Sequence, residues 1–175
     1  GGFHFLKAGM DAGGKVAGHF QVYFPEEIAH AGGLLPFKVR GAPIEPTRAD
    51  SHFGSYLCSI LKTSLELALS QRVQLEAFFT HPICDAARNL AGVWGRNFPY
   101  PSQILYLPQN ANSAHAADYL RHEYDRLRRT LEPIAGRAIT DDDLRRSIKV
   151  FNTNRALLRE IYDLKRTAPW LLPAD

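Results

Sequence analysis

Short apolar runs alternate with helix-like patterns along the first two thirds of the chain. An amphipathic helix from Pro25 to Ala31, ended by Gly32-Gly33, separates the first two runs, and helices beginning near Cys58 and at Cys84 follow later. Strands that alternate with helices predict a parallel sheet with right-handed crossovers. The glycine-rich residues 1–14 show no period, so no element is predicted there. The predicted strands are 15–24, 34–40, 76–80 and 103–107.

The last third has a purely helical pattern. Apolar residues from Ala117 to Ile134 repeat at steps of three and four, which predicts an amphipathic helix ended by Gly136. Thr140 and Asp143 then form a variant of the capping box. A second long helix follows, with the apolar stripe Leu144, Ile148, Phe151, Leu158, Ile161 and Leu164, and it ends at Pro169. We expect these two helices to pack against each other and against the sheet or a missing portion of the protein.

Together these patterns predict an α/β fold, with a Rossmann-like parallel sheet flanked by helices and followed by two long amphipathic helices. The predicted division is an α/β domain over residues 1–111 and a helical segment over residues 112–175. Near the middle, residues 48–51 are expected to cap the helix that carries Cys58. The apolar positions of that helix begin at Leu57 and include Ile60, Leu61, Leu65 and Leu69.

Composition narrows the functional classes. The chain has 175 residues, of which 45% are hydrophobic and 22% charged, and a formal net charge of +3. The weak, scattered positive charge gives no indication of nucleic-acid binding. No apolar run reaches the roughly 18 residues that cross a bilayer, so no membrane association is expected. Two cysteines without a secretory pattern favour a reducing compartment, and we expect a cytoplasmic protein.

The two cysteines are the main chemical candidates. Cys58 and Cys84 each lie where a predicted strand has given way to a helix, so in a parallel sheet both thiols belong to the edge where open α/β folds bind ligands. Helix N-termini favour negative charge, which suits a thiolate or an anionic iron–sulfur cluster. Two alternatives remain open. The thiols are buried small hydrophobes, or they form a zinc site with His81.

Other polar residues are weaker candidates for a catalytic or binding role. Glu26 and Glu27 begin a helix directly after a strand, where one of them is placed to act as an acid, a base or a substrate anchor; the alternative is simple complementation of the helix dipole. His19 on the first strand is expected to be a hydrogen-bonded core histidine. The sequence has no Walker A motif and no Gly-x-Ser-x-Gly elbow, which disfavours nucleotide hydrolysis and serine hydrolase chemistry.

Five segments stand in a recognisable order and spacing. They are 24–28 (Phe-Pro-Glu-Glu-Ile), 31–36 (Ala-Gly-Gly-Leu-Leu-Pro), 58–65 (Cys-Ser-Ile-Leu-Lys-Thr-Ser-Leu), 84–85 (Cys-Asp) and 152–155 (Asn-Thr-Asn-Arg). Together they resemble the benzoyl-CoA reductase and 2-hydroxyacyl-CoA dehydratase family over residues 15–164. Within that family the chain looks most like a substrate-reducing subunit of ATP-dependent benzoyl-CoA reductase.

The resemblance implies a subunit with two Rossmann-like domains and a 4Fe-4S cluster held by three cysteines near a CoA thioester. Cys58 and Cys84 match the first two ligands, and the third belongs to a C-terminal domain that this sequence lacks. Either the chain is a degenerate relative without a complete cluster or, as we expect, it is a fragment of a longer subunit. The implied partners are an acyl-CoA substrate, a homologous second substrate-binding subunit and ATP-hydrolysing electron-donor subunits.

The implied reaction is single-electron reduction of an aromatic acyl-CoA thioester at very low potential. Glu27, at the helix start, is the candidate for proton delivery or substrate placement. The alternative within the family is a 2-hydroxyacyl-CoA dehydratase subunit, which performs a radical dehydration. An alternative of another class is a non-catalytic structural subunit in which both thiols are merely packed.

Overall fold

A parallel sheet lies at the centre of the structure, a computed structural model that describes residues 2–20 and 22–171. The strand order is β2-β1-β3-β4, and each neighbouring pair runs in parallel. The strands are β1 (Val16–Phe20), β2 (Leu35–Lys38), β3 (Ala77–Thr80) and β4 (Ser102–Ile104). The alternation of apolar runs and helices therefore predicted the fold class correctly.

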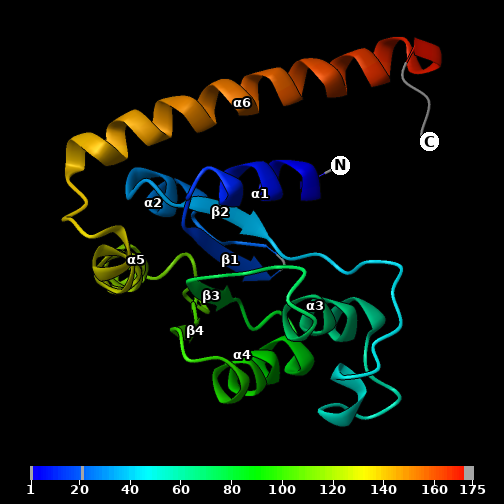
Figure 1. The fold of residues 1–175 in the computed structure, drawn as a ribbon. Coiled ribbons are helices and arrows are strands. Elements are labelled where there is room, and N and C mark those ends of the chain that lie inside the picture. The colour runs from blue at the N-terminus through cyan, green and yellow to red at the C-terminus, as the bar shows by residue number, and fades with distance from the viewer. Residues whose placement is uncertain (1, 21, 172–175) are drawn as a thin grey trace.

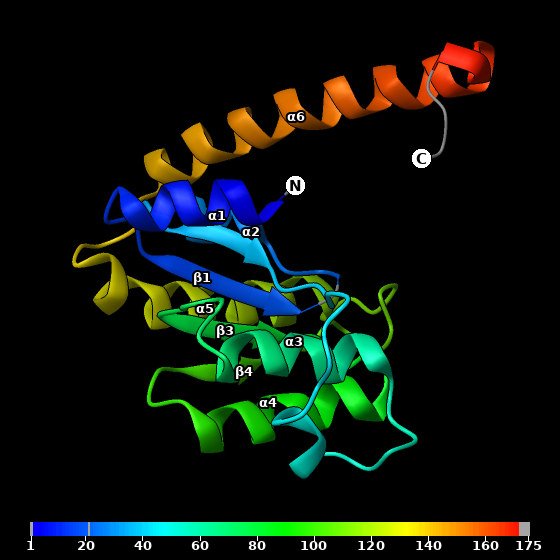
Figure 2. The ribbon, with the colours of Figure 1, turned by 45° about the vertical axis from the view of Figure 1, so that its right-hand side comes forward.

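Helices cover both faces of this sheet (Figures 1 and 2). On one face, α3 (Ser59–Leu69) and α4 (Asp85–Asn97) bury a core with Val16, Phe20 and Phe78, and α1 (Gly2–Asp11) adds Leu6 beside β2. On the other face, α2 (Glu26–Ala31) and α5 (Ala116–Ala135) pack over Ala17 and Phe79. Successive strand residues thus point to opposite cores, which explains why the two central strands, β1 and β3, are buried along their whole length.

The strands are shorter than the sequence indicated. The predicted strand 15–24 ends at Phe20, and residue 21 lies outside the described residues. The run 34–40 shortens to β2 (Leu35–Lys38), and the run 103–107 becomes β4, which begins one residue earlier, at Ser102, and ends at Ile104. Leu105 still donates its N–H to the carbonyl of Thr80 at 2.8 Å, so the apolar run continues past the regular strand. Residues 1–14, for which nothing was predicted, contain α1.

The segment before α3 differs from expectation. Residues 48–51 do not cap that helix, because they form a separate 3-10 turn, η1 (Ala49–Ser51). The N-cap of α3 is Cys58 itself. Leu61 and Leu65 are buried as predicted, whereas Ile60 is exposed.

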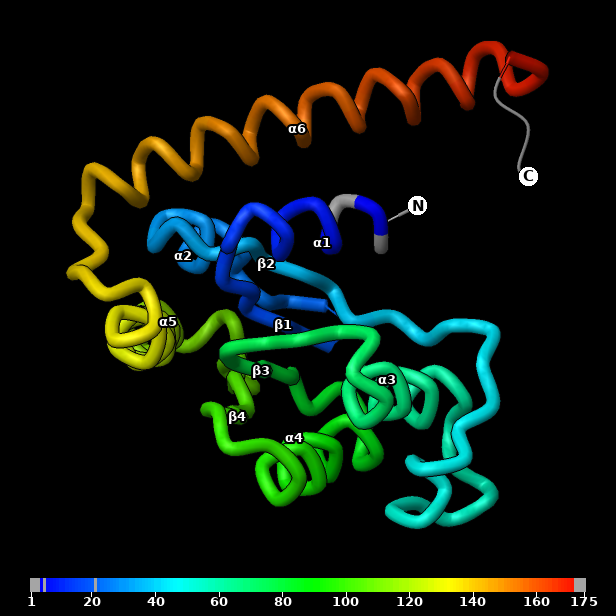
Figure 3. The backbone as a smooth tube through the Cα atoms, in the orientation of Figure 1, coloured from blue at the N-terminus to red at the C-terminus, as the bar shows by residue number. Residues whose placement is uncertain are grey.

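Helix α6 (Asp141–Thr167) begins and ends as predicted, and only its first part packs on the rest of the described chain. Gly136 ends α5 in the left-handed conformation, with φ 73°, and Thr140 and Asp143 form a reciprocal capping box. The first turns of α6 lie on α2, where the buried hydroxyl of Ser147 donates to the carbonyl of Glu27 at 2.8 Å. Its distal part, including Leu158, Ile161 and Leu164, is exposed and extends beyond the sheet (Figure 3). The distal stripe therefore packs on none of the described residues, and the expectation that a missing portion of the protein covers it stays a prediction.

No helix in the described part of the chain is both long enough and apolar enough to cross a membrane. The short turn η2 (Pro169–Leu171) follows α6 at the position where Pro169 was expected to stop it.

Candidate functional site at the carboxyl edge of the sheet

The strand order creates a natural ligand position between β1 and β3. From β1 the chain goes to β2 on one side, and from β3 it goes to β4 on the other. In open parallel sheets, ligands bind outside the carboxyl ends of strands at such a topological switch point. The loop after β1 leads to Glu26 and Glu27, and the loop after β3 leads to Cys84. The switch point therefore brings one predicted cysteine and both predicted glutamates to the same edge.

Tyr23 joins the two loops at this position. Its ring stands edge-on to the ring of His81, with centroids 5.1 Å apart, and His81 donates Nδ1–H to the carbonyl of Leu105 at 2.9 Å. Tyr23 has φ 66°, a left-handed backbone that a bulky non-glycine residue rarely adopts, and 60% of the side chain is exposed. Such strain often marks a functional position. The sequence placed Tyr23 in a strand, and nothing in its residue type signalled this conformation.

Cys84 lies at the strand-to-helix switch that the sequence predicted. It is the N-cap of α4, and its Sγ accepts the N–H of Ala87 at 3.4 Å. The thiol is exposed. The sulfur thus lies at a helix N-terminus and already accepts one backbone N–H of the first turn.

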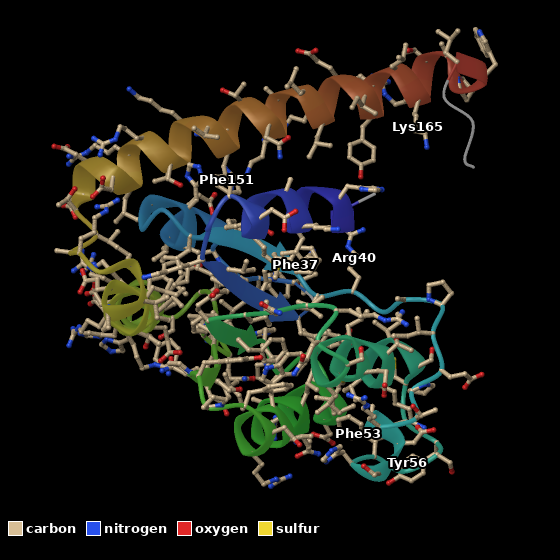
Figure 4. All side chains as sticks on the ribbon, viewed as in Figure 1. Phe37, Arg40, Phe53, Tyr56, Phe151 and Lys165 are labelled. Carbon is tan, nitrogen blue, oxygen red and sulfur yellow. The ribbon has the colours of Figure 1, made fainter. Side chains whose placement is uncertain are left out.

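Cys58 has the same position on α3. It is the N-cap, it is exposed, and its side chain makes no capping hydrogen bond. Unlike Cys84, it does not directly follow a strand, since the loop and η1 separate it from β2. Figure 4 shows Phe53 and Tyr56 on this loop, and Tyr56 is almost fully exposed. The exposure of both thiols contradicts the alternative that they are buried small hydrophobes.

The donor set on this chain fits part of an iron–sulfur site. Thiolates are the usual cluster ligands, and both cysteines present exposed sulfur at helix N-termini. Among residues 2–20 and 22–171, no group of three or more His, Cys, Asp or Glu side chains is arranged to hold a metal ion. The zinc site of Cys58, His81 and Cys84 is therefore not formed.

Glu26 is held by a buried histidine. His19 is 2% exposed, donates Nε2–H to Glu26 Oε1 at 2.9 Å and stacks on Phe24. This hydrogen bond is the main reason that the pKa of Glu26 lies below its usual value, against the opposing effect of burial. His19 Nδ1 is buried and has no hydrogen-bond partner among the described residues. The prediction of a hydrogen-bonded core histidine thus holds for one ring nitrogen only.

Glu27 is tied to α6. Its carboxylate forms an ion pair with Arg155, and Arg155 also donates to Asn152 Oδ1 at 2.8 Å. The Asn152–Arg155 segment therefore bonds to another part of the subunit. Close by, burial raises the pKa of Tyr124, and the negative charge of Glu27 adds to this effect. Both predicted glutamates consequently have specific partners beyond the helix dipole.

A hollow beside Cys58 carries positive charge. It measures about 530 Å³ and lies between the end of β2 and the first turn of α3. Lys38 and Arg40 line it, and Figure 4 labels Arg40 on the chain that leaves β2. The sequence did not single out these two cations.

Comparison with known proteins identifies relatives along almost the whole chain. A family model described as 2-hydroxyglutaryl-CoA dehydratase, D-component, matches residues 21–175. One of the benzoyl-CoA reductase subunits of Thauera aromatica is 40% identical over 94% of this chain and 44% of its own length. The beta subunit of the (R)-2-hydroxyglutaryl-CoA dehydratase of Acidaminococcus fermentans is 30% identical over 93% of this chain and 44% of its own length. The chain thus spans less than half the length of these relatives.

Proposed function

Because this chain belongs to the 2-hydroxyglutaryl-CoA dehydratase D-component family, we propose that it is part of an iron–sulfur subunit that binds and reduces an aromatic acyl-CoA thioester. The family membership confirms the resemblance found in the sequence. The observation that carries the proposal is the placement of Cys58 and Cys84 as exposed N-caps of two helices that follow parallel strands. Two unrelated packing roles would not require both thiols to be exposed there.

In this proposal Cys58 and Cys84 supply two of three protein ligands to a 4Fe-4S cluster. The chain has two cysteines in total, so the third ligand comes from outside these 175 residues. We place it in a further α/β domain to which the helical segment 112–175 leads, with residues 1–111 as the cluster-bearing domain. The bound cluster supplies electrons at low potential.

The side chains at the switch point have the remaining tasks. Glu27 holds or delivers a proton, or positions the thioester, and Arg155 fixes the direction of its carboxylate through their ion pair. Tyr23 shields the space between the loops after β1 and β3. The partners are a homologous second substrate-binding subunit and an ATP-hydrolysing electron donor, in the cytoplasm.

Two reactions fit this site, and their products distinguish them. The 40% identity to a benzoyl-CoA reductase subunit favours reduction of the aromatic thioester, which yields a cyclic diene. The 30% identity to a dehydratase subunit supports the alternative, in which a 2-hydroxyacyl thioester yields an enoyl thioester. A non-catalytic structural subunit would give neither product and would contain no iron.

The test is anaerobic purification of the product of the complete gene together with its partner subunits. Iron and sulfide are measured in wild type, Cys58→Ser and Cys84→Ser, with Ser113→Ala before α5 as a control that removes no thiol. We expect roughly four irons per cluster site in wild type and control, and loss of iron in either cysteine variant. Equal iron in all four proteins would exclude the cysteines as ligands.

A further inference from the structure

The two cysteines are supported by the fold in different ways. Cys84 follows β3 through residues 81–83, and its Sγ accepts a backbone N–H of α4. Cys58 follows β2 only after residues 39–57, which swing away from the sheet and return to α3 (Figure 1), and its side chain makes no capping hydrogen bond. The position of the Cys58 sulfur therefore depends on how this loop is held.

Two charged side chains of α3 hold the loop. Lys62 and Glu66 come four and eight residues after Cys58, so the three residues follow one another along one face of the helix. Both Lys62 and Glu66 are buried. A charged group is stable in a buried position when it is paired or hydrogen-bonded, so the partners of these two side chains show what they stabilise.

Glu66 fixes the loop where it enters η1. Its Oε2 accepts the backbone N–H of Arg48 at 2.8 Å and that of Ala49 at 2.9 Å. The guanidinium of Arg48 in turn donates to the carbonyl of Leu69, the last residue of α3, at 2.6 Å. The backbone before η1 is thus bonded to the middle and to the end of the helix.

Lys62 fixes the part of the loop next to the cysteine. Its Nζ lies 2.8 Å from Asp50 Oδ1 and donates to the carbonyl of Ser55 at 3.3 Å. Residues 54–57, which the structure describes in full, add no side chain to either hydrophobic core. The stretch directly before Cys58 is therefore held to α3 by a charge-assisted hydrogen bond and not by apolar packing.

We propose that Lys62 and Glu66 are positioning residues, which hold this loop so that the Cys58 sulfur has its ligand position before a cluster binds. The inference rests on the proposed function, because it takes the role of Cys58 as a ligand from there. A ligand position that is already formed lowers the ordering cost of binding. Neither charge was singled out as a candidate in the sequence.

The experiment uses the protein from the complete gene with its partner subunits, purified anaerobically. Lys62→Met removes the ammonium group but keeps a long side chain, and Lys62→Arg keeps the charge and the donors. Glu66→Gln removes the charge and keeps one acceptor oxygen. Lys149→Met, at an exposed lysine of α6, is the matched control. For every protein we measure the rate at which a chelator removes iron and, by mass spectrometry, the deuterium uptake of residues 48–57 and 81–84.

We expect residues 48–57 to take up deuterium at least about tenfold faster in Lys62→Met, which is the scale on which a hydrogen bond to a charged group shifts a local equilibrium. Iron release should accelerate by a similar factor. Residues 81–84 should keep their wild-type uptake. Lys62→Arg should restore most of both rates, Glu66→Gln should raise both by a smaller factor, and Lys149→Met should match wild type.

A wild-type rate of iron release in Lys62→Met would overturn the inference. An equal rise in the uptake of residues 48–57 and 81–84 would also overturn it, because that result means general destabilisation. If Lys62→Met does not assemble, Glu66→Gln decides by the same two criteria. If Cys58→Ser loses iron while Lys62→Met releases it at the wild-type rate, the proposed function stands and only this inference fails. If Cys58→Ser keeps its iron, Cys58 is not a ligand, and both fail together.

Discussion

At the scale of single residues, the most consequential contact is the one between His19 and Glu26. The imidazole is almost fully buried and directs Nε2 at the carboxylate, which fixes a charged group at the start of α2. Lys38 and Arg155 contribute smaller electrostatic effects on the pKa of Glu26. His19, Lys38 and Arg155 thus all favour the charged form of Glu26 at the start of α2.

Replacing the ring tests this arrangement. In His19→Phe the carboxylate loses its hydrogen-bond donor, so we expect the pKa of Glu26 to rise, while Lys38→Ala should produce a smaller rise in the same direction. Carbon-detected NMR titration of the Glu26 carboxyl gives both values. A larger rise in Lys38→Ala than in His19→Phe would mean that distant charge, and not the hydrogen bond, sets the pKa.

The two tryptophans, one buried and one exposed, provide a matched pair of substitutions that tests the contribution of core packing to stability. Trp94 of α4 is fully buried and stacks on Phe78 of β3 with centroids 3.7 Å apart, whereas Trp170 is 76% exposed. Trp94→Ala should lower the free energy of unfolding by about 3–5 kcal/mol, the usual cost of deleting a large buried ring. Trp170→Ala should change it by less than about 0.5 kcal/mol.

Urea denaturation followed by circular dichroism measures both variants. A similar loss of unfolding free energy in the two variants would show that the interface between α4 and β3 contributes no more to stability than an exposed side chain does. Because α4 presents Cys84, the Trp94 variant should also have reduced iron retention in the assembled protein.

Residue type alone predicted some of the site and missed the rest. The sequence placed Cys84 and Cys58 at helix starts, and the structure confirms that placement, while their role as ligands stays a prediction. Tyr23 was not found, since a left-handed tyrosine depends on tertiary contacts that leave no local pattern. Glu27 was found by position, but its ion pair with Arg155 joins residues far apart in the chain.

At the scale of elements, the start of α6 is the clearest case of local sequence determining local structure. Thr140 accepts the N–H of Asp143, and Asp143 accepts the N–H of Thr140 at 2.9 Å. Thr140→Ala should therefore destabilise the fold by about 1 kcal/mol, and Thr140→Ser, which keeps the hydroxyl, should restore most of it. Chemical denaturation of both variants is the measurement. Equal stability of Thr140→Ala and wild type would mean that water replaces the cap at no cost.

The same cap makes stability depend on pH. Hydrogen bonds from Arg137, and then from Thr140, hold the pKa of Asp143 well below its usual value. A lowered carboxyl pKa stabilises the folded state at pH values above the unfolded pKa of about 3.9, and this stabilisation disappears as the pH falls through the folded value.

Comparison with an uncharged variant isolates this contribution. We expect wild type to be more stable than Asp143→Asn at pH 7, and the difference to shrink progressively below about pH 4. Urea midpoints at a series of pH values provide the test. A difference that stays constant down to about pH 2 would show that the carboxylate charge is not responsible.

Element bounds were less predictable than element types. The predicted strand 15–24 was too long because Val22 and Phe24 continue the apolar pattern after the backbone has left the sheet. Residues 48–51 resemble a helix cap in sequence, yet they begin η1, and Glu66 of α3 accepts the backbone N–H groups of Arg48 and Ala49. Local composition cannot distinguish these two uses of polar residues.

At the scale of the whole molecule, α6 divides into two parts with different surroundings. Its first turns lie on α2, and Phe151 contacts His30 there, whereas residues 152–167 are exposed throughout (Figure 4). Figure 4 labels Lys165 on this distal part. A helix segment without buried contacts opens locally at low cost.

Hydrogen exchange of the isolated 175-residue chain tests this division. We expect amides of residues 152–167 to exchange much faster than those around Leu127 and Leu131 of α5, which are fully buried. In the assembled protein from the complete gene the distal amides should become protected. Equal protection of both regions in the isolated chain would show that α6 is stable without partners.

The fold class followed from the sequence, but the order of its strands did not. Alternating strands and helices establish that the sheet is parallel, and they leave open which strands are neighbours. Placing β1 beside β3 depends on long-range packing, such as Phe79 against Phe24. That strand order creates the switch point. The sequence could therefore assign the candidate site to one edge of the sheet, but only the structure shows which crevice at that edge is meant.

The central place of β1 also determines when this protein can fold during synthesis. Among the described strands β1 is made before the others, yet Ala17 pairs with Ala77 of β3, which is made sixty residues later. Until then β1 has only β2 beside it, and its other edge presents unpaired backbone groups. The nascent chain therefore carries an unpaired, aggregation-prone strand edge throughout the synthesis of the whole cysteine-bearing helix α3.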